Sequence, residues 1–142
     1  DMDQRGVPVT EGREQKEFVK WLRATYPQHS HCLRASLAGL NFGSGHKAAR
    51  MVNHLKGQGV ESGESDIVLA LPRHGFGSLV IEYKSGEGKH KLSEAQAQYL
   101  EKHNVSGNLA MLVKGLPALK QAVTDYIGDT VPGNERESDR QR

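Results

Sequence analysis

Residues 63–84, GESDIVLALPRHGFGSLVIEYK, hold the clearest structural pattern in this chain. They contain two apolar segments, residues 67–71 and 78–84, separated by the turn-forming sequence PRHGFG. Two such segments joined by Pro and Gly residues are typical of a β-hairpin. We therefore expect two antiparallel strands, the first preceded by Asp66 and the second ending in the charged sequence Glu82-Tyr83-Lys84.

Three charged residues of this hairpin, Asp66, Glu82 and Lys84, could form a metal-binding catalytic site. Side chains alternate between the two faces of a strand, so Glu82 and Lys84 share one face and lie roughly 6–7 Å apart. The apolar residues Leu79 and Ile81 then share the other face with Tyr83. A hairpin also brings Asp66 beside Glu82. Two carboxylates and one ammonium group at a sheet end can hold a divalent cation and position a nucleophilic water.

The composition places limits on the class of protein. A chain of 142 residues suits one domain with its own core, and a single cysteine, Cys32, excludes an internal disulfide and fits a reducing compartment. No run of 18 apolar residues and no signal pattern is present, so we expect a soluble, cytoplasmic protein without a membrane partner. A net charge of +2 is compatible with nucleic acid only through a local basic patch.

The remaining sequence predicts helices around a mixed sheet, an α/β fold in the order α-β-α-β-β-α-β-α. Apolar stripes indicate helices over residues 11–25, 46–56 and 117–127, and alternation or a short apolar run indicates strands over residues 32–38 and 108–113. Ser93-Glu94-Ala95-Gln96 fits a capping box at the start of another helix, which by itself says nothing about function. Residues 1–10 are expected to be loose, 11–128 to form the domain, and 129–142 to be a disordered polar tail.

These residues, in this order, resemble the PD-(D/E)XK nuclease superfamily. Within it, the chain is similar to a stand-alone VRR-NUC domain of the phage and bacterial type over about residues 11–126. Gly63 and Asp66 match the family's G-x-P-D motif, with Ser65 in place of the proline. Glu82-Tyr83-Lys84 matches E-x-K, and Ser93, Gln96 and Tyr99 match S-x-x-Q-x-x-(W/Y). Proline would stiffen the approach to the strand without supplying chemistry, so we expect an intact but looser site.

The resemblance implies a restriction-endonuclease-like sheet and a role for each matching residue. Asp66, Glu82, the main-chain carbonyl of Tyr83, and Glu11 would bind Mg²⁺ or Mn²⁺, and Glu14 competes with Glu11 for the last place. Lys84 and Gln96 would act with them as catalytic residues, Lys84 on the attacking water and Gln96 near the scissile phosphate or Lys84. The contacts to DNA would come from Lys89, His90, Lys91, Ser93 and Tyr99.

The function implied by this resemblance is that of a metal-dependent endonuclease. It would hydrolyse phosphodiester bonds of branched or otherwise structured DNA, as a junction-resolvase-like homodimer. The alternative is a non-catalytic DNA-binding module that has kept the nuclease-like fold. The presence of Asp66, Glu82 and Lys84 argues against that alternative, since a module without activity would be expected to lose them.

Other motifs have simpler explanations. Residues 43–48, GSGHKA, imitate a dinucleotide-binding fingerprint, but the preceding strand is short and no second βαβ half follows. Residues 86–89, GEGK, lack the first glycine of a P-loop and are better read as a basic loop. His29, His31 and Cys32 have no second pair of ligands at zinc spacing.

Overall fold

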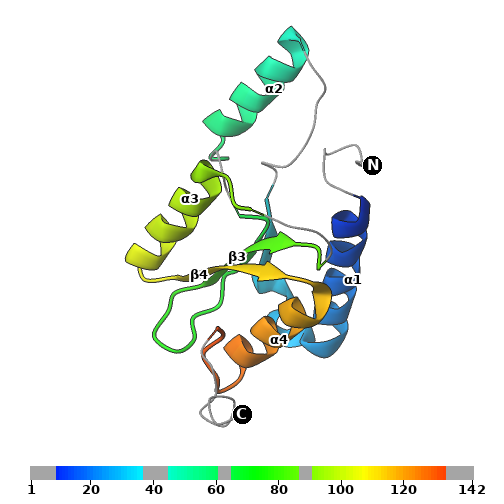
Figure 1. Cartoon of the computed structure of the whole chain (residues 1–142), viewed down its shortest axis with the longest axis vertical. Coiled ribbons are helices and arrows are strands. Elements are labelled where there is room, and N and C mark those ends of the chain that lie inside the picture. Colours follow the sequence, from blue (N-terminus) through cyan, green and yellow to red (C-terminus); the bar gives the residue numbers. More distant parts are fainter. Residues whose placement is uncertain (1–8, 37–44, 61–64, 87–90, 134–142) are drawn as a thin grey trace.

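The structure, a computed structural model, describes residues 9–36, 45–60, 65–86 and 91–133, with backbone only for residues 9–11 (Figure 1). The order of elements is the one expected from the sequence, with a 3₁₀ helix added after the first helix. The elements are α1 (Val9–Thr25), η1 (Pro27–Cys32), β1 (Leu33–Ala35), α2 (His46–Gly57), β2 (Ile67–Leu69), β3 (Leu79–Lys84), α3 (Glu94–Val105), β4 (Leu109–Lys114) and α4 (Leu116–Ile127).

The four strands form one mixed sheet in the order β1-β2-β3-β4. β1, β2 and β3 are antiparallel neighbours, whereas β4 runs parallel to β3. The expected hairpin is confirmed: Ile67 pairs with Ile81, and the turn closes with a bridge between Arg73 and Phe76. His74 and Gly75 have φ angles of 54° and 83° in this turn. Two successive residues with positive φ match the twist of a hairpin.

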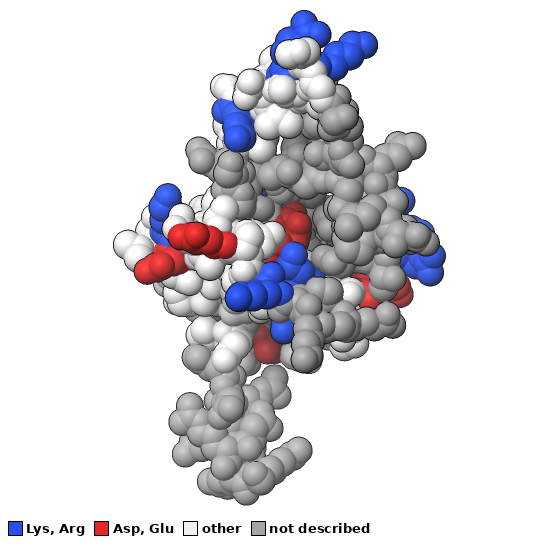
Figure 2. Space-filling view, turned by 45° about the horizontal axis from the view of Figure 1, so that its top comes forward, with Lys and Arg blue, Asp and Glu red and all other residues white. Residues whose placement is uncertain are grey.

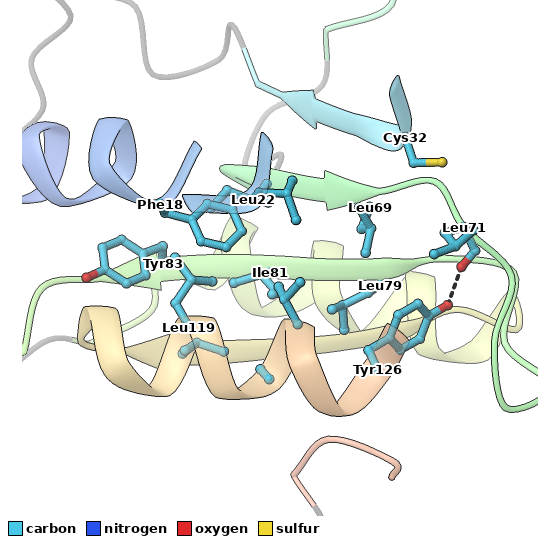
Figure 3. Packing of buried hydrophobic residues seen from close by; sticks show 14 residues of the cluster. Phe18, Leu22, Cys32, Leu69, Leu71, Leu79, Ile81, Tyr83, Leu119 and Tyr126 are labelled. Atoms are coloured by element: carbon cyan, nitrogen blue, oxygen red, sulfur yellow. Dashed lines mark hydrogen bonds between the residues drawn. The ribbon is translucent and has the colours of Figure 1, made fainter. Parts of the chain in front are cut away.

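Helices cover both faces of the sheet, and each face has its own apolar cluster. On one face, Leu79, Ile81 and Tyr83 pack against α1 and α4, where the ring of Phe18 is 1% exposed (Figure 3). On the other face, Val80 packs with Leu100 of α3 and Ala110. The alternation predicted for β3 is therefore confirmed, and it leaves Glu82 on the face that α3 covers.

The starts of two helices were predicted correctly. Ser93 Oγ accepts a hydrogen bond from the Gln96 N–H at 3.1 Å, and Gln96 Oε1 accepts one from the Ser93 N–H at 2.9 Å, which completes the capping box. In α4, Pro117 lies in the first turn, where its missing N–H costs nothing. Gly128 follows the last residue of α4.

Some boundaries differ from the expectation. α1 begins at Val9, inside the segment expected to be loose. The prediction missed this first turn because the apolar periodicity of a helix does not mark its exact start. Acidic residues in the first turn, here Glu11, stabilise a helix that starts this early. β2 ends at Leu69 rather than residue 71, where the Leu71 N–H donates to the Leu69 carbonyl at 2.9 Å and not to a neighbouring strand. In the expected tail, Pro132 is buried, while residues 134–142 lie outside the described part. No helix among the described residues is long and apolar enough to cross a membrane.

Candidate metal and nucleic-acid site

The antiparallel register of β2 and β3 brings two acidic residues together. Because Ile67 pairs with Ile81, the next pair along the ladder is Asp66 and Glu82. The main-chain N–H of Tyr83 donates a hydrogen bond to Asp66 Oδ2 at 2.9 Å, which holds the aspartate side chain beside β3. The structure thus places the two carboxyl groups predicted from the sequence at one end of the hairpin.

Glu82 is the buried member of this pair, with 2% of its side chain exposed. Its Oε1 accepts a hydrogen bond from Gln96 Nε2 at 2.8 Å and lies 3.5 Å from Lys84 Nζ. Its Oε2 is buried and has no hydrogen-bond partner. One oxygen of the carboxylate is therefore fixed by the protein. The other accepts no hydrogen bond, and it needs either a cation or a proton that Glu82 can share with Asp66.

Burial and charge repulsion change the acidity of Glu82. Desolvation, followed by the charge of Asp66, raises the pKa of Glu82 from 4.5 to about 8, although Lys84 acts in the opposite direction. The protein without metal thus favours a proton on this carboxyl group near neutral pH. A divalent cation at Oε2 would supply the same charge compensation, so the site fits a hard metal ion.

The described residues supply only part of a metal coordination shell. Among them, no group of three or more His, Cys, Asp or Glu side chains could hold a metal ion. Mg²⁺ commonly uses one or two carboxylates and fills its other positions with water and substrate oxygens. Asp66 and Glu82 meet that requirement, and a third protein ligand stays a prediction.

Glu14 and Glu11 are the two candidates for the third carboxylate, and the structure describes the side chain of Glu14 alone. Glu14 accepts a hydrogen bond from the Tyr83 hydroxyl. The Tyr83 ring packs on the α1 face of the sheet, away from Glu82, so the structure does not bring Glu14 to the other carboxylates. Glu11 lies one turn earlier in α1, and its side chain is outside the described residues. The role of Glu11 and the ligand role of the Tyr83 carbonyl remain predictions.

The predicted DNA-contacting residues are only partly described. Lys91 and Ser93 are exposed at the start of α3, and Tyr99 is half-buried with its ring centroid 4.6 Å from that of His103. Lys89 and His90 lie outside the described residues. The described members all lie on the α3 side of the sheet, as do Glu82 and Lys84.

Sequence reasoning missed Lys114, which the register places directly across from Lys84. Its side chain is exposed, and it ends β4 as Lys84 ends β3. Parallel neighbouring strands end at the same edge of a sheet. A lysine at the end of the strand that follows α3 could therefore have been predicted to lie near Lys84. Its position adds positive charge at the edge of the sheet where β3 ends in Lys84.

Ser65, which replaces the family's proline, is 1% exposed, and its hydroxyl has no hydrogen-bond partner. It also lines a hollow of about 90 Å³ with residues of β1, β2 and α3, namely Arg34, Ala35, Ser36, Val68 and Tyr99. The predicted looseness is not tested by this geometry. The burial shows that the serine is packed within the domain.

Trp21 of α1 has a structural role. Trp21 packs against the core beside Phe18, with their ring centroids 5.8 Å apart. His31 Nε2 lies 3.5 Å from Cys32 Sγ, and no further ligand joins them among the described residues.

Comparison with known proteins supports the fold. No protein-family model matches the chain, and no curated protein matches its sequence. Among solved structures, the chain is similar to a VRR_NUC domain protein, with a TM-score of 0.68 and 22% sequence identity over 89% of this chain and 98% of that chain. The chain therefore has a restriction-endonuclease-like fold, a mixed sheet flanked by helices, of the kind seen in that VRR-NUC domain.

Proposed function

We propose that this chain is a VRR-NUC nuclease of the PD-(D/E)XK superfamily that hydrolyses DNA phosphodiester bonds with Mg²⁺ or Mn²⁺. The proposal rests on one observation, the arrangement around Glu82. Asp66 lies opposite Glu82 across the hairpin, Gln96 donates a hydrogen bond to Glu82 Oε1, and Lys84 forms an ion pair with the same oxygen. The likeness in fold to a VRR_NUC domain protein agrees with it.

The metal would be held by Asp66 and Glu82, with the Tyr83 carbonyl and Glu11 as further ligands. The buried Glu82 Oε2, which has no hydrogen-bond partner, is the atom best prepared for this role. When bound, such an ion makes a water molecule more acidic and offsets the negative charge of a phosphodiester.

The neighbouring side chains would prepare the site for this reaction. Gln96 donates to Glu82 Oε1, which would leave Oε2 to hold the cation. Lys84, 20% exposed and 3.5 Å from Oε1, has an ammonium group that can orient the attacking water and donate hydrogen bonds to a phosphate oxygen. Gln96 also lies in the first turn of α3, whose N–H groups favour anions.

We further propose that the substrate is branched or structured DNA and that the chain works as a homodimer. The formal net charge of +2 is too small for a strong sequence-independent grip at physiological salt. Shape-matched contacts from two subunits would compensate, and a two-fold dimer suits two symmetric incisions.

The test is cleavage of a four-way junction and of a linear duplex of equal length, with Mg²⁺, Mn²⁺ or EDTA. We expect cleavage only with metal, a preference for the junction, and no cleavage by Glu82→Gln. Glu101→Gln, a change at an exposed glutamate of α3, is the matched control and should cut like the wild type. Binding of DNA without cleavage under every condition would favour the non-catalytic module.

A further inference from the structure

Helix α2 separates its charged and apolar residues onto opposite sides. Successive residues are turned by about 100° around a helix axis, so residues seven apart and three or four apart share a side. The basic side carries His46, Lys47, Arg50 and His54. The apolar side carries Ala48, Met51, Val52 and Leu55. The helix contains no acidic residue. α1 also carries basic residues on one side, Arg13, Lys16, Lys20 and Arg23, but unlike α2 it contains acidic residues as well, Glu14 and Glu17 among them.

The exposure of these side chains shows that the basic side of α2 is open to solvent. Lys47 and Arg50 are exposed, whereas Ala48 is buried and Leu55 half-buried. Met51 and Val52 are exposed as well, at 42% and 39%. The basic side is therefore available to a ligand, and the apolar side is covered only at Ala48 and partly at Leu55.

The position of α2 relates it to the carboxylate pair. Figure 1 shows α2 projecting from the body beyond the N-terminal end of α3, the end at which Gln96 contacts Glu82. Figure 2 shows Lys and Arg side chains gathered on the end of the molecule that α2 forms, and acidic side chains in a recess nearer the middle. A helix of 12 residues is about 18 Å long. It can thus reach parts of a DNA molecule well away from a bond held at the recess.

We propose that the basic side of α2 binds the phosphate backbone of the DNA that the carboxylate pair cleaves, which rests on the proposed function. Charge complementarity selects this ligand, because Lys47 and Arg50 on the basic side are not offset by any acid in the helix. Lys47, Arg50 and Lys56 give α2 a formal charge of +3, whereas the whole chain has +2, so the rest of the chain is slightly acidic. The DNA phosphates that α2 binds lie away from the scissile phosphate. α2 therefore contributes to binding affinity and leaves the chemical step unchanged.

The test compares two double variants of the full chain. Lys47→Ala/Arg50→Ala removes two exposed cations three residues apart in α2. Lys20→Ala/Arg23→Ala removes two exposed cations at the same spacing in α1, which packs on the opposite face of the sheet. Fluorescence anisotropy with a labelled junction in EDTA measures binding over a series of salt concentrations, and single-turnover cleavage at saturating enzyme measures the chemical step. Circular dichroism confirms that each variant is folded.

We expect the α2 variant to bind at least tenfold more weakly, with a salt slope lower by about two units and an unchanged single-turnover rate. The α1 variant should bind like the wild type. If wild type binds and cuts DNA while the two variants behave alike, the role of α2 is overturned and the proposed function stands. If wild type neither binds nor cuts DNA, the proposed function fails and the role of α2 fails with it.

A second copy of the chain is the other possible occupant of α2. Met51→Ser/Val52→Ser tests it by sedimentation velocity together with the binding assay. If these changes dissociate a dimer while Lys47→Ala/Arg50→Ala leaves DNA affinity unchanged, α2 is a subunit interface, and the proposal is overturned.

Discussion

Replacing Glu82 by glutamine should make the stability of the metal-free protein less dependent on pH. The side chain is 2% exposed, and its pKa is raised from 4.5 to about 8. A group whose pKa is higher in the folded state stabilises the fold while it is protonated. This contribution is complete below pH 4.5 and is lost as the pH rises through about 8. A glutamine side chain has nearly the shape of glutamate and keeps an oxygen that can accept the hydrogen bond from Gln96 Nε2, but its amide group does not ionise.

The size of the effect follows from the shift in pKa. Each unit corresponds to about 1.4 kcal/mol, so the shift sets a ceiling of roughly 5 kcal/mol. Relaxation around a buried charge and entry of water reduce such penalties, and we expect about 2–4 kcal/mol. In EDTA, Glu82→Gln should therefore match wild type near pH 5 and exceed its free energy of unfolding by that amount at pH 8.5.

Urea unfolding followed by circular dichroism at several pH values measures this difference. Glu101→Gln serves as the control, because Glu101 is exposed on α3 and its change should leave the pH profile of wild type in place. A constant difference in unfolding free energy between wild type and Glu82→Gln from pH 5 to 8.5 would refute the reasoning. In that case Glu82 would be ionised without penalty and would have no need of a cation.

The remaining predictions concern single side chains. Ser65→Ala should raise the free energy of unfolding by about 1 kcal/mol in urea, because it removes a buried hydroxyl without a partner, and cleavage should persist. Tyr126→Phe should lower it by about 1 kcal/mol, since the hydroxyl donates to the Leu71 carbonyl at 2.6 Å; no change would mean that this bond is not formed in solution. Lys84→Ala should reduce the single-turnover rate at saturating enzyme, whereas Lys91→Ala should weaken binding and lower the salt slope by about one unit. The opposite pattern would exchange the two roles.

The hairpin and its chemical face could be predicted because both follow from local rules. Alternation places Glu82 and Lys84 on one side of a strand, and a short turn fixes which residue lies opposite Glu82. The capping box likewise depends on residues three apart in the chain, and it brought Gln96 close to Glu82 once α3 had packed on the sheet.

Features that depend on how distant elements pack could not be predicted in this way. The place of Lys114 beside Lys84 follows from the parallel register of β3 and β4, which are separated by α3 in sequence. The contact between Glu14 and the Tyr83 hydroxyl depends on the rotation of α1 about its axis relative to the sheet. Spacing within α1 therefore left Glu14 as an alternative to Glu11.

The most direct test of the central claim is calorimetric titration of Mn²⁺ into wild type, Asp66→Asn and Glu82→Gln at pH 8. If the two carboxylates share one ion, wild type should bind Mn²⁺ and each variant should lose that binding, while Glu101→Gln keeps it. Equal Mn²⁺ binding by wild type and both variants would contradict the claim that Asp66 and Glu82 form the metal site.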